Sequence, residues 1–202
     1  MKVVIIGATG RVGSRLASEL LSRGHVVTGI ALHTPSEAAP GVKVLQADAT
    51  KPDSLAPCLV GQDAVISASR FVTSDANALI AAVKKAGVKR LLVVGGAGGL
   101  EVTPGKALMD TDRFPDAFKP EAAAGARFLE RLKEERNLDW TFLSPSADFA
   151  PGTRTGRFRL GGDQLLTDRT SKSHISMEDF AIAMADELER PAHSRQRFTV
   201  GY

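Results

Sequence analysis

The chain has 202 residues, of which 43% are hydrophobic and 24% charged, and this is typical of one soluble globular domain. Its 26 basic and 23 acidic residues leave a formal net charge of +3 and are scattered, so neither nucleic acid nor a membrane surface is predicted as a partner. No apolar run approaches the roughly 18 residues that cross a bilayer, and the apolar stretch after Lys2 is too short for a secretory signal. The single cysteine, Cys58, favours a reducing, cytoplasmic location.

The first two dozen residues predict a strand, a glycine turn and a helix. Residues 3–6 form a short β-branched run typical of a strand buried on both faces, and apolar residues then recur at helical spacing from Val12 to Leu21. Glycines at 7, 10 and 13 would allow a sharp bend, a close approach of backbone to a pyrophosphate, and tight packing of the helix on the strand. The predicted pyrophosphate site is therefore Gly7, Ala8, Thr9, Gly10, Arg11, Val12 and Gly13.

The chain then alternates between strands and helices. Strands are predicted at 25–32, 43–47, 63–69, 91–94 and 140–143, and helices at 52–60, around 79–86 and at 120–136. This alternation predicts a parallel sheet covered by helices on both faces. The predicted fold class is a Rossmann-like, doubly wound α/β fold, with residues 1–202 forming one dinucleotide-binding domain.

Two later segments interrupt the alternation. Prolines at 104, 115 and 120 predict a long loop or a pair of short helices over 100–120, and loops of that length are often functional. Residues 148–163 are predicted to form a small hairpin, whose arginines at 154, 157 and 159 would either meet a phosphate or form a solvated face. A capping box at Ser176 begins a helix to about residue 189, and 196–200 could add a last strand. This C-terminal part is the predicted substrate side.

The glycine turn Gly7-Ala8-Thr9-Gly10-Arg11-Val12-Gly13 resembles the fingerprint of the atypical and extended short-chain dehydrogenases, especially their NmrA-like and biliverdin-reductase-B-like groups. Residues 91–100, 139–145, 159–163 and 196–202 resemble the bacterial proteins grouped as NADH-flavin reductases. The resemblance covers essentially the whole chain. It implies a protein that binds NAD(P) and acts as a reductase.

Strand order and this resemblance together place the remaining cofactor contacts, because ligands of open parallel sheets bind beyond the carboxyl ends of the strands. His33 is expected at the adenosine ribose, and Asp48 and Ala49 at the adenine. The expected contacts of the nicotinamide ribose are Ser67, Ala68 and Ser69, and those of the nicotinamide are Gly95, Gly96, Ala97, Ser144 and Pro145.

The end of the second strand decides between the two dinucleotides, because an acidic side chain there would bind the ribose 2′-hydroxyl and repel a 2′-phosphate. This chain has Ala31-Leu32-His33-Thr34 at that point, without an acid. NADP(H) is therefore favoured over NAD(H). Arg11 is the nearest cation to the phosphates, although a solvated first-turn residue is an equally good interpretation of it.

The short-chain dehydrogenases usually protonate their substrate with a tyrosine four residues before a lysine. Here the single tyrosine is Tyr202, and the helix that should carry the pair reads Glu121-Ala122-Ala123-Ala124-Gly125-Ala126. Gly95 and Gly96 also replace the serine usually found after the fifth strand. Carbonyl reduction through this relay is not expected, and no catalytic residue or metal ligand is assigned.

Hydride transfer to a flavin, quinone or similar conjugated acceptor needs no such relay, because the acceptor itself takes up the electrons. An NAD(P)H-dependent oxidoreductase with a small-molecule acceptor is the first hypothesis. The second is a non-catalytic, NmrA-like sensor in which the dinucleotide sets the shape of residues 100–120 for a protein partner. A structural module is a third, which would leave the phosphate turn without a use.

Overall fold

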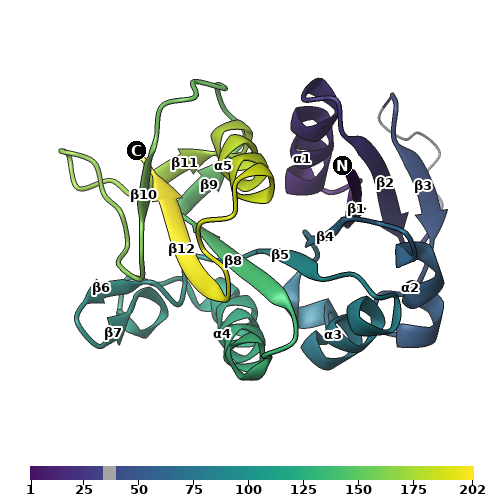
Figure 1. The fold of residues 1–202 in the computed structure, drawn as a ribbon. Helices are drawn as coiled ribbons and strands as arrows, with labels where there is room; N and C mark the ends of the chain where they lie inside the picture. Colours follow the sequence, from purple (N-terminus) through teal and green to yellow (C-terminus); the bar gives the residue numbers. More distant parts are fainter. Residues whose placement is uncertain (34–39) are drawn as a thin grey trace.

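The computed structural model describes residues 1–33 and 40–202; residues 34–39, within the predicted loop from His33 to Gly41, lie outside the described part. Its centre is an eight-stranded sheet in the order β3-β2-β1-β4-β5-β8-β12-β10 (Figure 1). All neighbours are parallel except β10, which runs antiparallel to β12. The strands are β1 (Lys2–Ile6), β2 (Val26–Ala31), β3 (Lys43–Gln46), β4 (Ala64–Ser67), β5 (Arg90–Val94), β8 (Asp139–Pro145), β10 (Arg159–Gly161) and β12 (Gln196–Gly201).

Helices cover both faces of this sheet (Figure 1). One face carries α1 (Arg11–Ser22) and α5 (Met177–Glu189), and the other carries α2 (Pro52–Leu59), α3 (Ala76–Lys85) and α4 (Lys119–Glu134). Side chains of β1 alternate between the two resulting cores, with Val3 and Ile5 in one and Val4 and Ile6 in the other. A strand buried on both faces must be apolar throughout, which explains the unbroken run 3–6. The predicted Rossmann-like, doubly wound fold is confirmed.

The strand order reverses between β1 and β4. From β1 the chain moves outward through β2 to β3, and it returns to β4 on the other side of β1 before continuing to β5 and β8. The connections on the two sides of this point lead to opposite faces, which opens a crevice above the carboxyl ends of β1 and β4. Most predicted site residues follow strands that end at this edge.

The predicted hairpin over 148–163 is wrong. β9 (Asp148–Ala150) pairs in parallel with β11 (His174–Ser176), and β10 pairs with β12. Local alternation indicates a strand but not its partner, and here both partners come from later in the chain. The arginines are also more than a solvated face, since Arg154 Nε pairs with Glu19 of α1 at 2.8 Å and Arg159 donates to the carbonyl oxygen of Tyr202.

The segment 100–120 contains both short helices and a short hairpin. β6 (Glu101–Thr103) pairs antiparallel with β7 (Lys106–Ala107), and the 3-10 helices η2 (Leu108–Asp110) and η3 (Asp116–Phe118) follow. The hairpin is an addition to the predicted pair of helices. A further 3-10 helix, η1 (Phe71–Thr73), comes directly after β4.

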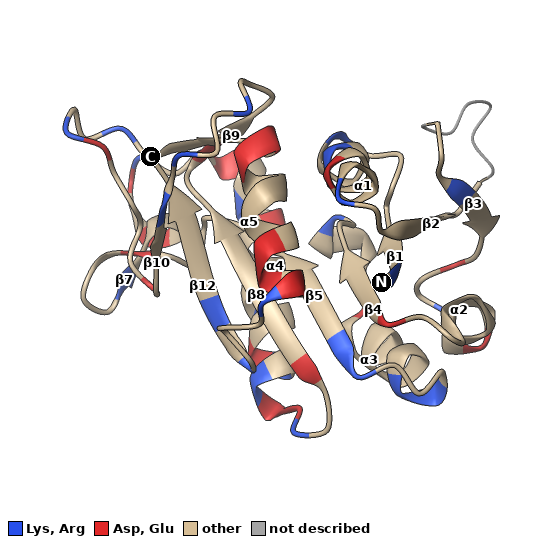
Figure 2. Ribbon diagram, turned by 45° about the horizontal axis from the view of Figure 1, so that its top comes forward, with Lys and Arg blue, Asp and Glu red and all other residues tan. Residues whose placement is uncertain are grey.

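Charged residues are interleaved over the elements, with basic and acidic segments alternating along the ribbon (Figure 2). Within the described ranges, no helix has both the length and the apolar composition that crossing a membrane requires.

Candidate dinucleotide site and adjoining cavity

The turn after β1 requires glycine at its first position. Gly7 has φ +82°, a left-handed conformation that side chains with a Cβ rarely adopt, and its N–H donates to Ile30 O at 3.0 Å. A Cβ there would also lie only 2.9 Å from Ala68 O, at the end of β4. Gly7 therefore lets the chain turn sharply while it packs against the neighbouring strand end.

The other two glycines of the turn have different roles. Gly13 is buried, and a Cβ on it would lie 2.8 Å from the carbonyl carbon of Gly7, so it permits close packing of α1 on the turn. Gly10 is the exposed N-cap of α1 with φ −73° and ψ 170°, backbone angles that any residue can adopt, although a Cβ there would lie 3.2 Å from Gly7 O. The absence of a side chain at Gly10 leaves the first turn of α1 uncovered.

That first turn is suited to an anion. The N–H groups of residues 11–13 have no acceptor within the helix, the N-cap makes no side-chain hydrogen bond, and the turn carries no acidic side chain. Such a helix end presents N–H donors and the positive end of the helix dipole. The residues thus fit the pyrophosphate of a dinucleotide, which Gly7 to Gly13 would hold through backbone groups.

Arginines flank this helix end. Arg15 Nε donates to Glu178 Oε1 at 2.9 Å, which ties the first turns of α1 and α5 together, and Arg15 Nη1 donates to Arg11 O. Arg11 itself is exposed, and among the described residues no partner engages its guanidinium. It is therefore available to a phosphate group.

The structure brings the ends of β2, β3 and β4 to the same edge as the turn. Ala68 N donates to Ile6 O at 2.8 Å, which places Ala68 and Ser69 beside the turn, while Ser67 is buried in β4. His33 is exposed just after β2. The contacts predicted between these residues and the two riboses stay predictions.

Asp48 and Ala49 follow β3. Asp48 Oδ1 accepts from the Thr50 hydroxyl at 2.6 Å and the Thr50 N–H at 3.0 Å, and these hydrogen bonds hold the pKa of the Asp48 carboxyl below its ordinary value. Its carboxylate is therefore committed to the turn before α2. Ala49 is partly buried against the core. Their contact with adenine also stays a prediction.

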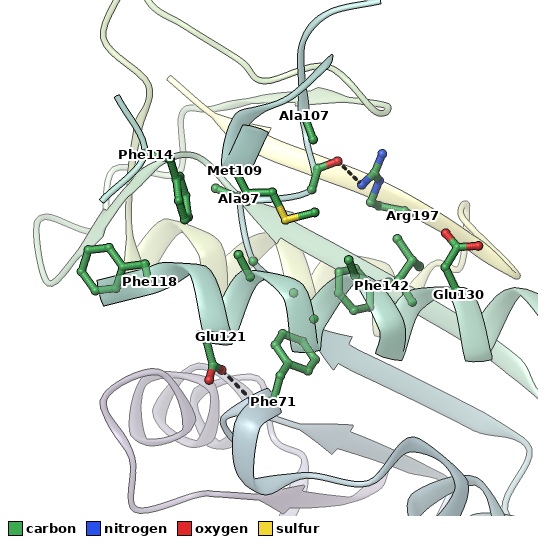
Figure 3. A pocket seen from close by; sticks show the side chains of 18 of the residues that line it. Phe71, Ala97, Ala107, Met109, Phe114, Phe118, Glu121, Glu130, Phe142 and Arg197 are labelled. Carbon is green, nitrogen blue, oxygen red and sulfur yellow. Dashed lines mark hydrogen bonds between the residues drawn. The ribbon is translucent and has the colours of Figure 1, made fainter. Parts of the chain in front are cut away.

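A cavity of about 420 Å³ adjoins this edge on the α4 side of the sheet (Figure 3). The predicted nicotinamide contacts Gly95, Gly96 and Ala97 line it, and so do Phe71 and Phe142, whose rings stack with centroids 5.8 Å apart. α4 forms the opposite wall. The remaining lining residues are Gly98, Gly99, Ala107, Met109, Phe114, Phe118, Glu121, Ala122, Gly125, Ala126, Leu129, Glu130, Lys133, Ala147 and Arg197.

Ser144 and Pro145 do not line this cavity. Both are buried within β8, and the Ser144 side chain is 0% exposed, whereas Ala147, two residues beyond the strand, contributes to the wall. The buried Ser144 hydroxyl has no hydrogen-bond partner among the described residues. The contacts predicted between Ser144, Pro145 and the nicotinamide stay predictions.

Tyr202 lies away from the cavity lining. Its hydroxyl donates to Asp179 Oδ2 at 2.7 Å, and burial together with the negative charge of Asp179 raises the pKa of the Tyr202 phenol. The cavity is lined instead by Glu121, on the helix where short-chain dehydrogenases carry their tyrosine. Glu121 Oε1 accepts from Phe71 N at 2.6 Å and Oε2 from Val72 N at 3.2 Å. This carboxylate holds η1 against α4.

The sequence did not single out Met109, Phe114, Phe118, Glu121 or Arg197. The first three lie in the segment 100–120, whose prolines marked it as a functional loop but gave no sign of which side chains face inward. Arg197 comes from β12, about a hundred residues from its partner Gly99 O, to which its Nη1 donates at 2.8 Å. A pattern of neighbouring residues in the sequence cannot predict a contact between residues so far apart in the chain.

The strand order, the glycine turn and the open N-terminus of α1 define a dinucleotide-binding protein of the Rossmann type. The profile of the NAD(P)H-binding family matches residues 7–191, and the chain belongs to that family.

Three similar proteins span nearly the whole chain. The uncharacterized protein YwnB of Bacillus subtilis is 39% identical over 99% of this chain and 98% of its own. A solved structure of a candidate exported protein from Burkholderia pseudomallei is 46% identical, covers 100% of both chains and has a TM-score of 0.92. A solved structure of a candidate NADH-flavin reductase from Streptococcus pneumoniae is 34% identical, covers 100% of this chain and 99% of its own and has a TM-score of 0.86.

Proposed function

We propose that the protein is an NAD(P)H-dependent oxidoreductase that reduces a flavin, a quinone or a similar conjugated ring. The observation that carries this proposal is the cavity of about 420 Å³ that opens at Gly95 to Ala97, the residues predicted to face the nicotinamide. Its walls are largely apolar and aromatic, and no tyrosine lines it. The likeness to the candidate NADH-flavin reductase supports the same class of reaction.

In this proposal the start of α1 binds the dinucleotide and the cavity binds the acceptor. Backbone N–H groups at the start of α1 would hold the pyrophosphate, and the bound dinucleotide would supply the hydride. The cavity would stack the acceptor ring over Gly95 to Ala97 and exclude water from it. A conjugated ring takes up the negative charge that develops, so solvent can deliver the proton and a tyrosine relay is unnecessary.

An acceptor panel tests this proposal. The absorbance of reduced nicotinamide is followed while flavins, quinones, simple aldehydes and unactivated ketones are offered to the purified protein. We expect turnover with flavins or quinones and none with unactivated carbonyl compounds. Robust reduction of an unactivated ketone would contradict the argument from the missing relay. Tight dinucleotide binding with no turnover on any acceptor would instead favour the regulatory hypothesis, in which residues 100–120 contact a protein partner.

We also propose a preference for NADP(H) over NAD(H). Residues 31–33 carry no acid at the end of β2, and no residue in the described part of the chain engages the guanidinium of Arg11 beside the phosphate turn. Because tighter binding raises the melting temperature by mass action, NADPH should give the larger thermal shift at equal concentration. Replacing Arg11 with alanine should narrow that difference, and a larger shift with NADH would reverse the assignment.

We also propose that the protein is located in the cytoplasm. It is supported by the single cysteine, Cys58, which cannot form an intrachain disulfide and is partly buried against the core in α2. Cell fractionation followed by immunodetection would check it, and recovery of the protein outside the cytoplasm would contradict it.

A further inference from the structure

The charged side chains that line the cavity are balanced in number. Two are basic, Lys133 and Arg197, and two are acidic, Glu121 and Glu130. The wall therefore offers a ligand no net charge. Whether it can accept an ionic group depends on how these four side chains are already engaged.

Each of the four already has a partner within the protein. Arg197, with only 12% of its side chain exposed, donates from Nε to Asp163 Oδ1 at 2.7 Å and from Nη1 to Gly99 O at 2.8 Å. Lys133 Nζ pairs with Glu130 Oε1 at 2.8 Å. Glu121 accepts the two N–H groups of η1 described above. Lys133 and Glu130 are 53% and 68% exposed, so their pair holds the lysine less firmly than Asp163 and Gly99 hold Arg197. Among the cavity-lining residues that the structure describes, an anionic ligand would thus gain a cation only by breaking an existing pair.

The end of the cavity away from Arg197 is apolar. Phe114 and Phe118 lie there, and Met109 projects between this end and Arg197 (Figure 3). The Phe118 side chain is 62% exposed, although a phenyl group is usually buried. Aromatic rings and a thioether at the mouth of a pocket favour flat, polarisable ligands.

We propose that this cavity selects acceptors by charge, taking uncharged planar rings and rejecting rings that carry an anionic substituent. This inference rests on the proposed function and names the substrate class of the same site. The physical reason is that an anionic substituent would lose its water and could gain a cation only by breaking a pair such as Lys133–Glu130, whereas an uncharged ring loses little. We expect discrimination of about tenfold or more in kcat/KM, as is usual for an uncompensated buried polar group.

A pair of quinones with one ring system tests the selectivity. The uncharged member is 2-methyl-1,4-naphthoquinone, and the charged member is 1,4-naphthoquinone-2-sulfonate. The sulfonate withdraws electrons and makes its ring the stronger oxidant, so a preference for the methyl compound cannot arise from intrinsic reactivity. A kcat/KM for the sulfonate equal to or above that of the methyl compound would overturn the inference.

A charge placed in the cavity should invert the selectivity. Met109→Lys puts an ammonium group at the centre of the wall, and Met109→Leu is its matched uncharged control. We expect kcat/KM for the sulfonate, divided by kcat/KM for the methyl compound, to rise about tenfold in the lysine variant. The same ratio should stay unchanged in the leucine variant. Phe118→Lys, at a mostly exposed position, repeats the test if Met109→Lys does not fold.

A binding measurement separates failure of this inference from failure of the proposed function. Isothermal titration of each quinone into protein saturated with 1,4,5,6-tetrahydro-NADP, whose nicotinamide ring is uncharged and transfers no hydride, gives the same comparison without turnover. Tighter binding of the methyl compound, even with no turnover, supports the inference while contradicting the proposed reductase. Equal binding of both quinones, or binding of neither, would overturn the inference whatever the activity.

Discussion

The two edges of the sheet use polar groups in opposite ways. At the carboxyl edge, backbone N–H groups at the start of α1 are left open and glycine keeps side chains away from them. At the amino edge, a buried cluster joins β5, β8 and α5: Arg90 Nη2 donates to Glu187 Oε1 at 3.0 Å, and Arg90 Nη1 donates to the Thr141 hydroxyl at 2.8 Å. One edge is prepared for a ligand, and the other is closed by the protein itself.

Glu187 is the centre of the closed edge. It also accepts from the N–H of His193 at 3.0 Å and from His193 Nδ1 at 2.8 Å, and the His193 ring stacks on Phe198 with centroids 3.9 Å apart. Burial alone would raise the pKa of the Glu187 carboxyl, but the hydrogen bonds and charge of His193 outweigh it and hold that pKa below its ordinary value. The comparison sets a buried charge that is fully partnered against backbone N–H groups that are left for the proposed ligand.

The largest effect should come from breaking the closed edge. Glu187→Ala removes one carboxylate from the buried Arg90 guanidinium and leaves only the more exposed carboxylate of Asp139, whose Oδ1 lies 3.2 Å from Arg90 Nη1. This loss should cost about 3 kcal/mol of unfolding free energy. Chemical denaturation measures it. Glu189→Ala, which removes a more exposed partner of Arg23 and His25, is the control and should cost under about 1 kcal/mol. If the two variants lost the same stability, the amino edge would not have the role assigned to it.

The next largest effect should be a loss of NADPH affinity at the carboxyl edge, with little loss of stability. Gly10→Val covers the first turn of α1 at backbone angles that valine can adopt, so the pyrophosphate loses its contacts. Its Cβ would lie 3.2 Å from Gly7 O, so the turn must shift by a few tenths of an ångström, at a small cost in stability. Losing two such hydrogen bonds to a charged group costs about 3 kcal/mol, or about 100-fold in Kd for NADPH. Gly162→Val, at an exposed glycine with open space around it, is the matched control. Unchanged NADPH affinity in Gly10→Val would remove the main support for the dinucleotide site.

The smallest effect should be the part of the acid sensitivity that Glu187 contributes at the closed edge. Because the pKa of Glu187 is lower in the folded chain than its ordinary value of 4.5, its ionised form stabilises the fold above that pH, and this contribution is lost as the pH falls through the folded pKa. Unfolding free energies measured from pH 6 downward should therefore fall more steeply in the wild type than in Glu187→Gln. Parallel curves would show that Glu187 does not titrate differently in the folded state.

Local chemistry made the cofactor half of the protein predictable. The run 3–6 followed by Gly7, Gly10 and Gly13 identifies a strand, a turn and a helix, because the left-handed φ of Gly7 and the packing of Gly13 on Gly7 are set within the turn itself. The further contact of Gly7 with Ala68 O, from β4, was not predictable in this way. Helix α4 and the capping serine of α5 were likewise predictable, since Pro120 and Ser176 act on their own first turns. The spacing of apolar residues along the chain likewise predicts which face of each helix or strand is buried.

The cavity beside α4 could not be predicted, because its walls come from places far apart in the chain. Phe71 follows β4, Phe114 lies in the segment 100–120, and Arg197 belongs to β12; the order of strands in the sheet brings them together. The mistaken hairpin at 148–163 has the same cause, since alternation shows that a strand exists but not which strand it pairs with.

The sequence by itself determined the fold class, the phosphate turn and the lack of a tyrosine relay, because these depend on residue type and on spacing along the chain. Only the tertiary structure decided that Tyr202 is bound to Asp179, that Glu121 faces the cavity and that Arg197 is already paired. Those facts depend on contacts between residues up to about a hundred positions apart, and such contacts form only once the sheet has assembled.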